Sequence, residues 1–215
     1  LSVPVATLAG LIVLIPGLTL TAALSELASQ HLASGTARLS GALMTFLGIA
    51  FGVALGNHVA VAALGLPPHP ATGSALLPAW AGAVALAVSP LCFTIIFRAD
   101  AREAPWIVAV GVLGVFAGRF GAATLGPELG AFAGAFAIAL ASRLYARLRH
   151  RPAAVVLVPG LLLLVPGTIG FRGLTSLMDR EVLAGVATAF SAIVTAVALV
   201  AGLLLAGVVA PERRP

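Results

Sequence analysis

Two proline–glycine pairs interrupt apolar stretches of the chain at equivalent positions. Pro16 and Gly17 lie in "GLIVLIPGLTLTAAL", and Pro166 and Gly167 lie in "GLLLLVPGTIGFRGL". Proline lacks a backbone donor and clashes with the preceding helical turn, and glycine frees the local backbone. Each pair therefore predicts a helix break that leaves main-chain amides and carbonyls unpaired. In an apolar stretch, such groups are tolerated only where protein or a water-filled cavity receives them.

The polar groups at the two breaks suit a small zwitterion. Half-helix ends offer partial charges to a carboxylate and an ammonium group. Hydroxyl side chains follow both breaks. A simple kink is the alternative, because proline and glycine are ordinary in membrane helices. The predicted substrate-binding residues at the breaks are Pro16, Gly17, Thr19, Thr21, Pro166, Gly167 and Thr168.

Four ionisable side chains are candidates for binding a substrate or carrying a proton. Arg119 lies deep in an apolar run, where it could bind a carboxylate, pair with Glu128 or snorkel to the interface. Glu26 could carry a proton if it is buried, because burial favours the neutral form of a carboxyl group. The alternative for Glu26 is a solvated helix end. Glu128 is either a second proton carrier or an interfacial carboxylate, and His58 is either a proton relay or a satisfied polar group.

The composition predicts a chain embedded in a lipid bilayer. It is 60% hydrophobic and 9% charged, with a mean hydropathy of +1.13, whereas soluble domains carry about 25% charged residues. The 12 basic residues are arginines at the edges of apolar runs, apart from Arg119, so we expect no nucleic-acid partner. The single cysteine, Cys92, excludes an internal disulfide and a cysteine-based metal site. HExxH and GxSxG motifs are missing, so we expect no enzyme activity, cofactor or metal.

Seven apolar stretches have about the 20 residues that a helix needs to cross the hydrocarbon core. They predict an all-α integral membrane protein with about seven transmembrane helices. The expected organisation is two helices in 1–66, a loop in 67–75, five helices in 76–210 and a tail in 211–215. Ser34, Gly35 and Thr36 predict the N-cap of the second stretch. The stretches are Val3–Ala23, Leu39–Leu66, Leu76–Phe97, Pro105–Leu125, Leu129–Leu148, Ala153–Phe171 and Val182–Ala210.

The arginines predict how the chain is oriented. If all seven stretches cross the membrane, nine arginines fall on one face and two on the other. Short cytoplasmic loops are enriched in arginine, so the face with nine is expected to be cytoplasmic and to hold the C-terminus. The nine are Arg38, Arg98, Arg102, Arg143, Arg147, Arg149, Arg151, Arg213 and Arg214, and the other two are Arg172 and Arg180.

The two breaks belong to an internal repeat with an offset of 150 residues. Five stretches separate the copies, an odd number, so the copies are expected to face opposite ways, as in inverted-repeat transporters. Stretches three to seven form a complete five-helix unit, but stretches one and two match only its last two helices. We therefore expect a 5+5 architecture whose first three helices are missing before Leu1. The matched residues are Gly10, Leu11, Leu14, Pro16 and Gly17 with Gly160, Leu161, Leu164, Pro166 and Gly167.

The chain resembles the threonine/serine exporters, a family of ten-span amino-acid exporters. The resemblance rests on "LIPGLTLTAALSELASQHLASGTARLSGAL" (14–43), "FRADAREAPWIVAVGVLG" (97–114), "GRFGAATLGPELGAFAGAFAIALASRLYARLRHRP" (118–152) and "VPGLLLLVPGTIGFRGLTSLM" (158–178). It implies export of threonine and serine driven by the proton motive force, in a bacterial inner membrane. The expected partners are these amino acids, protons and the lipid bilayer, and a homo-oligomer stays open. The alternative is a non-transporting membrane subunit, or a half-transporter whose partner supplies the missing helices.

Overall fold

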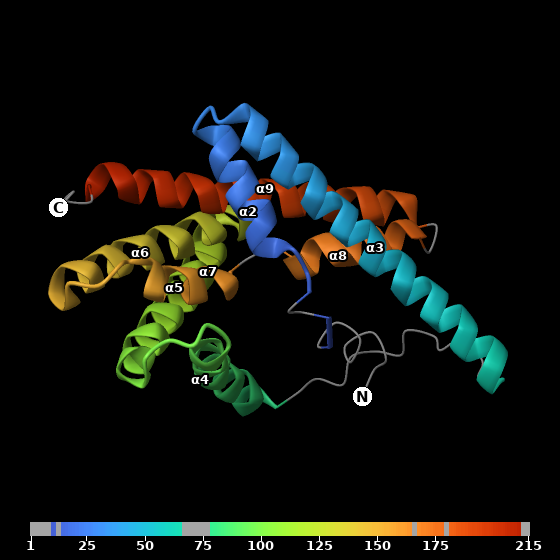
Figure 1. Cartoon of the computed structure of the whole chain (residues 1–215), viewed down its shortest axis with the longest axis horizontal. Helices are drawn as coiled ribbons and strands as arrows, with labels where there is room; N and C mark the ends of the chain where they lie inside the picture. The colour runs from blue at the N-terminus through green and yellow to red at the C-terminus, as the bar shows by residue number, and fades with distance from the viewer. Residues whose placement is uncertain (1–9, 12–13, 66–77, 165–166, 179–180, 212–215) are drawn as a thin grey trace. The chain divides into compact units, whose positions relative to one another are not determined.

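The computed structural model describes residues 10–11, 14–65, 78–164, 167–178 and 181–211. The regular secondary structure of these ranges is helical (Figure 1). A 3₁₀ turn, η1, precedes α5 directly. The elements are α2 (Gly17–Ala28), α3 (Leu32–Leu64), α4 (Ala79–Ile96), η1 (Ala101–Glu103), α5 (Ala104–Leu125), α6 (Pro127–Arg149), α7 (Ala154–Leu162), α8 (Gly167–Met178) and α9 (Val182–Val209).

Four described segments are long and apolar enough to cross a membrane: Leu32–Ala63, Ala101–Leu125, Pro127–Arg149 and Val182–Val209. Large apolar side chains are exposed on these helices; Phe51 on α3, for example, is 63% exposed. Lipid is the solvent that suits such a surface. The predicted all-α membrane fold is therefore confirmed, whereas the count of seven spans stays a prediction.

Contacts divide the chain into two compact units. Unit 1 comprises Leu1–Leu77 with Gly167–Ala192, and unit 2 comprises Pro78–Pro166 with Ile193–Pro215. The contacts thus group α8 and the start of α9 with α2 and α3. The predicted division of the chain near residue 70 stays a prediction.

Unit 1 is built around a small apolar cluster shared by α2, α3 and α8. Its buried members are Leu20, Ala42, Phe46 and Phe171. Helix α8 packs against α3 here, because a Cβ on Gly170 would be in ordinary contact with the ring of Phe46, at 3.4 Å. The cluster therefore holds α8 against the α2–α3 hairpin.

The helix boundaries in unit 1 repeat with the offset seen in the sequence. Helices α2 and α8 both have 12 residues, and they begin at Gly17 and Gly167. The helices that follow them, α3 and α9, begin at Leu32 and Val182. Both pairs of starts are 150 residues apart, so the two copies share helix boundaries as well as residue types.

Unit 2 rests on close packing of α5 against α6 through glycines. A Cβ on Gly130 would lie 2.6 Å from the carbonyl oxygen of Gly118 and 2.8 Å from the amide nitrogen of Ala122. Such spacing brings two helix backbones into contact, as small residues do in membrane bundles. Helix α7 packs on both α5 and α6.

One predicted helix boundary is wrong. Ser34, Gly35 and Thr36 do not cap α3, because α3 begins earlier, at Leu32, after His31. The hydroxyl of Thr36 donates instead to the carbonyl oxygen of Leu32, 2.7 Å away. Serine and threonine can make this bond inside a helix as well as at its start, so the pattern was ambiguous.

Candidate functional site

A helix begins directly after the first break, and no side chain caps its amino end. Helix α2 begins at Gly17, after Pro16, and it has no side-chain cap. The amide of Leu20 donates to the carbonyl oxygen of Pro16, 3.0 Å away, which makes this the first bond of the helix. The amide of Gly17 already donates to the carbonyl oxygen of Ile15, 2.8 Å away. The next two amides of the first turn lack partners within the helix, so this end of α2 can receive an acceptor.

The second break meets the first within unit 1. Helix α8 begins at Gly167. A Cβ on Gly167 would lie 2.7 Å from Cγ2 of Ile15, 3.3 Å from Cα of Gly17 and 3.6 Å from its nitrogen. Glycine at 167 thus lets the two main chains approach without displacing Ile15, and α2 and α8 start next to each other (Figure 1).

This arrangement concentrates positive potential. The amino end of each helix carries roughly half a positive charge. Two such ends repel each other in a weakly polar environment, and an anion between them relieves the repulsion while accepting hydrogen bonds. The chemistry that fits the junction of Gly17 and Gly167 is therefore the binding of a small carboxylate.

The hydroxyls near the first break differ in their surroundings. The side chain of Thr21 is buried, and its Oγ1 donates to the carbonyl oxygen of Gly17, 3.1 Å away. The hydroxyl proton of Thr21 is therefore used within α2. Thr19 is exposed. Pro166 and the side chain of Thr168 lie outside the described residues, so their predicted roles stay predictions.

Glu26 lies near the far end of α2 and is paired. Its Oε1 is 2.9 Å from Nε of Arg38, and its side chain is 27% exposed. The second carboxylate oxygen, Oε2, is buried without a hydrogen-bond partner. With a rise of about 1.5 Å per residue, Glu26 is roughly 13 Å from the break. It is therefore distant from the junction of the two helix starts.

Arg119 and Glu128 belong to unit 2. Arg119 is exposed and lines a cavity of about 270 Å³, together with Leu163 and Leu164. The two ion pairs found between described residues include neither Arg119 nor Glu128. The alternative in which these two residues pair is therefore not observed. His58 is exposed on α3.

A buried polar pair in unit 2 was missed by the sequence analysis. The hydroxyl of Tyr145 donates to Oε2 of Glu103, 2.7 Å away, and both side chains are at most 2% exposed. One signal could have revealed Tyr145: it continues a buried stripe of α6 that includes Ile138 and Ser142, at helical spacing. Glu103 had no such signal, because it directly precedes α5, and acidic residues are ordinary at a helix start.

The comparisons with known proteins agree with the sequence. A family model described as "Threonine/Serine exporter, ThrE" matches residues 82–209, and one described as "Putative threonine/serine exporter" matches residues 1–60. No curated protein and no solved structure matches the chain. The first family model alone covers more than half of the 215 residues, which confirms the resemblance. With its long apolar helices, the molecule is a multi-pass membrane protein, and the chain belongs to the threonine/serine exporter family.

Proposed function

We propose that this protein exports threonine and serine and that the substrate site is the junction of α2 and α8. The observation that carries the proposal is the contact between Gly17 and Gly167, the first residues of two helices, in a chain of an exporter family. Family membership favours transport over catalysis. The amides of the two first turns would bind the carboxylate of the amino acid, with Thr19 nearby for its polar groups.

Export is coupled to the proton motive force in this proposal, and Glu26 carries the proton. Of the three coupling candidates, Glu26 alone combines a buried, unpartnered carboxylate oxygen with an arginine partner. Protonation of Glu26 would remove its attraction to Arg38 and free the end of α2 from α3. Because α2 begins at the proposed substrate site, a movement of its far end can shift the residues of that site.

The proposed topology is that of an inverted repeat in a bacterial inner membrane, with the C-terminus in the cytoplasm. The equal offsets of the helix starts support the repeat, and the uneven distribution of arginines supports the orientation. Assembly into homo-oligomers is compatible with the large apolar surface of α3.

The test is efflux of radiolabelled threonine from proteoliposomes, with and without an imposed proton gradient. The variants Pro16→Ala and Pro166→Ala, checked for folding, remove one break each. Gradient-dependent efflux that both variants lose is the expected result. Efflux that both variants retain would reduce the breaks to kinks, and no threonine or serine flux in folded wild type would overturn the substrate assignment.

A further inference from the structure

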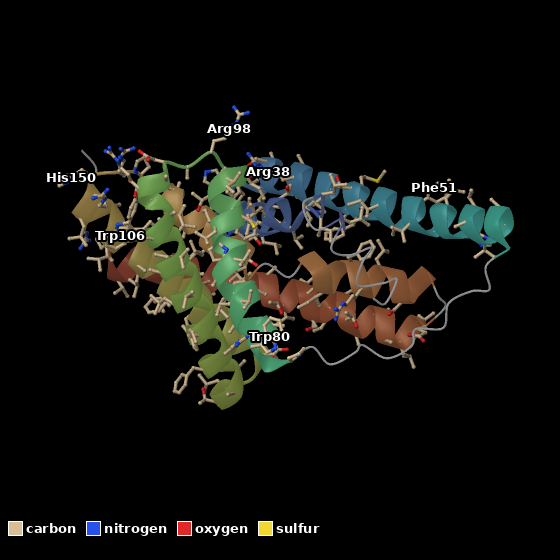
Figure 2. The ribbon with its side chains drawn as sticks, turned by 90° about the horizontal axis from the view of Figure 1, so that it is seen from below. Arg38, Phe51, Trp80, Arg98, Trp106 and His150 are labelled. Carbon is tan, nitrogen blue, oxygen red and sulfur yellow. The ribbon has the colours of Figure 1, made fainter. Side chains whose placement is uncertain are left out.

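A cavity with four charged side chains in its wall lies at the arginine-rich end of unit 2, apart from both helix breaks. Its volume is about 380 Å³, at the small end of the range for ligand pockets. The end of α4, η1, α6 and the start of α7 surround it. Figure 2 shows Arg98, Trp106 and His150 near this end of unit 2, whereas Trp80 marks the opposite end of α4.

The cavity wall contains a buried carboxylate with one unsatisfied oxygen. Glu103 is 2% exposed, and its Oε2 accepts the hydrogen bond from Tyr145. Its Oε1 is buried and has no hydrogen-bond partner. The nearest cation is Arg149, whose Nη2 is 3.7 Å from Oε1, which is longer than a hydrogen bond. A buried acceptor without a donor is costly, so Oε1 is placed to accept a donor from a ligand.

The charged side chains that line the cavity carry equal numbers of positive and negative charges. Arg98 and Arg151 line the cavity as two cations, and Asp100 and Glu103 line it as two anions. Arg149, which is not part of the lining, forms an ion pair with Glu103. The carboxylate of Asp100 already accepts from the backbone amide of Arg102, 3.1 Å away. The rest of the wall is mainly apolar and includes Val158. An anionic ligand would meet two carboxylates and a cationic ligand two arginines, whereas a small zwitterion can satisfy both signs.

We propose that the Glu103 cavity is a second binding site for a free α-amino acid, at the face of the membrane from which substrate is loaded. The ammonium group donates to Oε1 of Glu103, and the carboxylate pairs with Arg151 and Arg98. Tyr145 is a positioning residue that holds the carboxylate of Glu103 in place. The loading role rests on the proposed export function, but binding at the cavity does not.

Trp106 provides a local probe of this cavity. Its ring packs edge-on against Tyr145, with centroids 5.6 Å apart. The chain has two tryptophans, and Trp80 is 67% exposed, so Trp80→Phe leaves Trp106 as the sole indole with little disturbance. Fluorescence of this variant in phosphatidylcholine nanodiscs is titrated with threonine, with threonine amide (no carboxylate) and with 3-hydroxybutyrate (no ammonium).

We expect a saturable change with threonine and none with either analogue. Glu103→Gln keeps an acceptor for Tyr145 but removes the charge, and it should weaken binding about tenfold or more, as loss of a charged hydrogen bond does. Arg151 is exposed, so Arg151→Gln should fold and also weaken binding. The matched control is Arg102→Gln, at an exposed arginine of η1 that does not line the cavity, which should bind as wild type.

Several outcomes would overturn the proposal. A response to either single-charge analogue equal to that of threonine excludes zwitterion recognition. Unchanged affinity in Glu103→Gln and Arg151→Gln moves the site elsewhere. The ethanolamine phospholipid headgroup carries the same pair of charges, so a fluorescence change caused by such lipids alone would assign the cavity to lipid. Threonine efflux without a fluorescence response would overturn this site but leave the proposed export function standing. A fluorescence response without efflux would support this site but overturn the export function.

Discussion

Gly17 and Gly167 are in contact although 150 residues separate them in the chain. A Cβ on Gly167 would lie 3.3 Å from Cα of Gly17, closer than side chains ordinarily come to a neighbouring backbone. The contact places the first turns of α2 and α8 side by side. Each break alone could be a simple kink, but together the two breaks bring two helix starts into contact.

Gly167→Ala should impair transport while leaving the fold intact. The added methyl would push against Ile15 and Gly17 and separate the two helix starts. We expect threonine efflux to fall about tenfold or more, because small displacements of binding groups have large effects on turnover. The control is Gly48→Ala in α3, where a Cβ meets nothing within 4 Å. Equal efflux in the two variants would argue against a substrate site at this contact.

Glu26→Gln should uncouple export from the proton gradient. The amide is similar in shape to the carboxylate but cannot take up and release the proton, and it loses the charge that attracts Arg38. We expect threonine to flow down its own gradient at a rate that no longer responds to an imposed pH difference. Glu181→Gln, at an exposed carboxylate, should retain the pH response. A normal response in Glu26→Gln would move the coupling role to another residue.

Tyr145→Phe should destabilise unit 2. It leaves Oε2 of Glu103 without its donor in a buried environment, which costs about 1–3 kcal/mol of unfolding free energy. Thermal unfolding in detergent, followed by circular dichroism, measures the loss. Thr36→Val removes an exposed hydroxyl and should change stability by less than about 0.5 kcal/mol. A Tyr145→Phe protein as stable as wild type would show that water or a ligand satisfies Glu103.

Gly130→Ala should disrupt the packing of α5 on α6. The new methyl would meet the backbone of Gly118 and Ala122, which cannot rotate away as a side chain can. Overpacking of this kind costs about 1–3 kcal/mol. Gly82→Ala, in open space on α4, should instead be neutral or stabilise the helix by up to about 1 kcal/mol. Equal thermal stability of the two variants would contradict the observed helix approach.

The sequence predicted those features that follow from local chemistry. The bilayer environment follows from composition, and the starts of α2 and α8 follow from proline, which cannot continue a helix from the preceding turn. The start of α3 was placed too late, because a Ser-Gly-Thr run is compatible with both a cap and a helix interior. The length of the other apolar stretches was sufficient to place α4, α5 and α6 to within a few residues.

The features that were not predicted depend on packing between distant segments. The bond between Glu103 and Tyr145 joins residues 42 positions apart, and it forms only because α6 returns alongside the start of α5. The approach of Gly167 to Gly17 likewise depends on how α8 packs on Phe46. A single sequence gives the residue types of such pairs but not which residues meet.

The close fit at Gly167 also constrains how this chain can evolve. Because a methyl at 167 would collide first with Cγ2 of Ile15, alanine at 167 becomes acceptable only together with a smaller residue at 15. Positions 15 and 167 should therefore vary together among homologous exporters, and Ile15→Ala should rescue Gly167→Ala. The two repeats can diverge independently over most of their length, but a substitution at 167 in one repeat requires a matching substitution at 15 in the other.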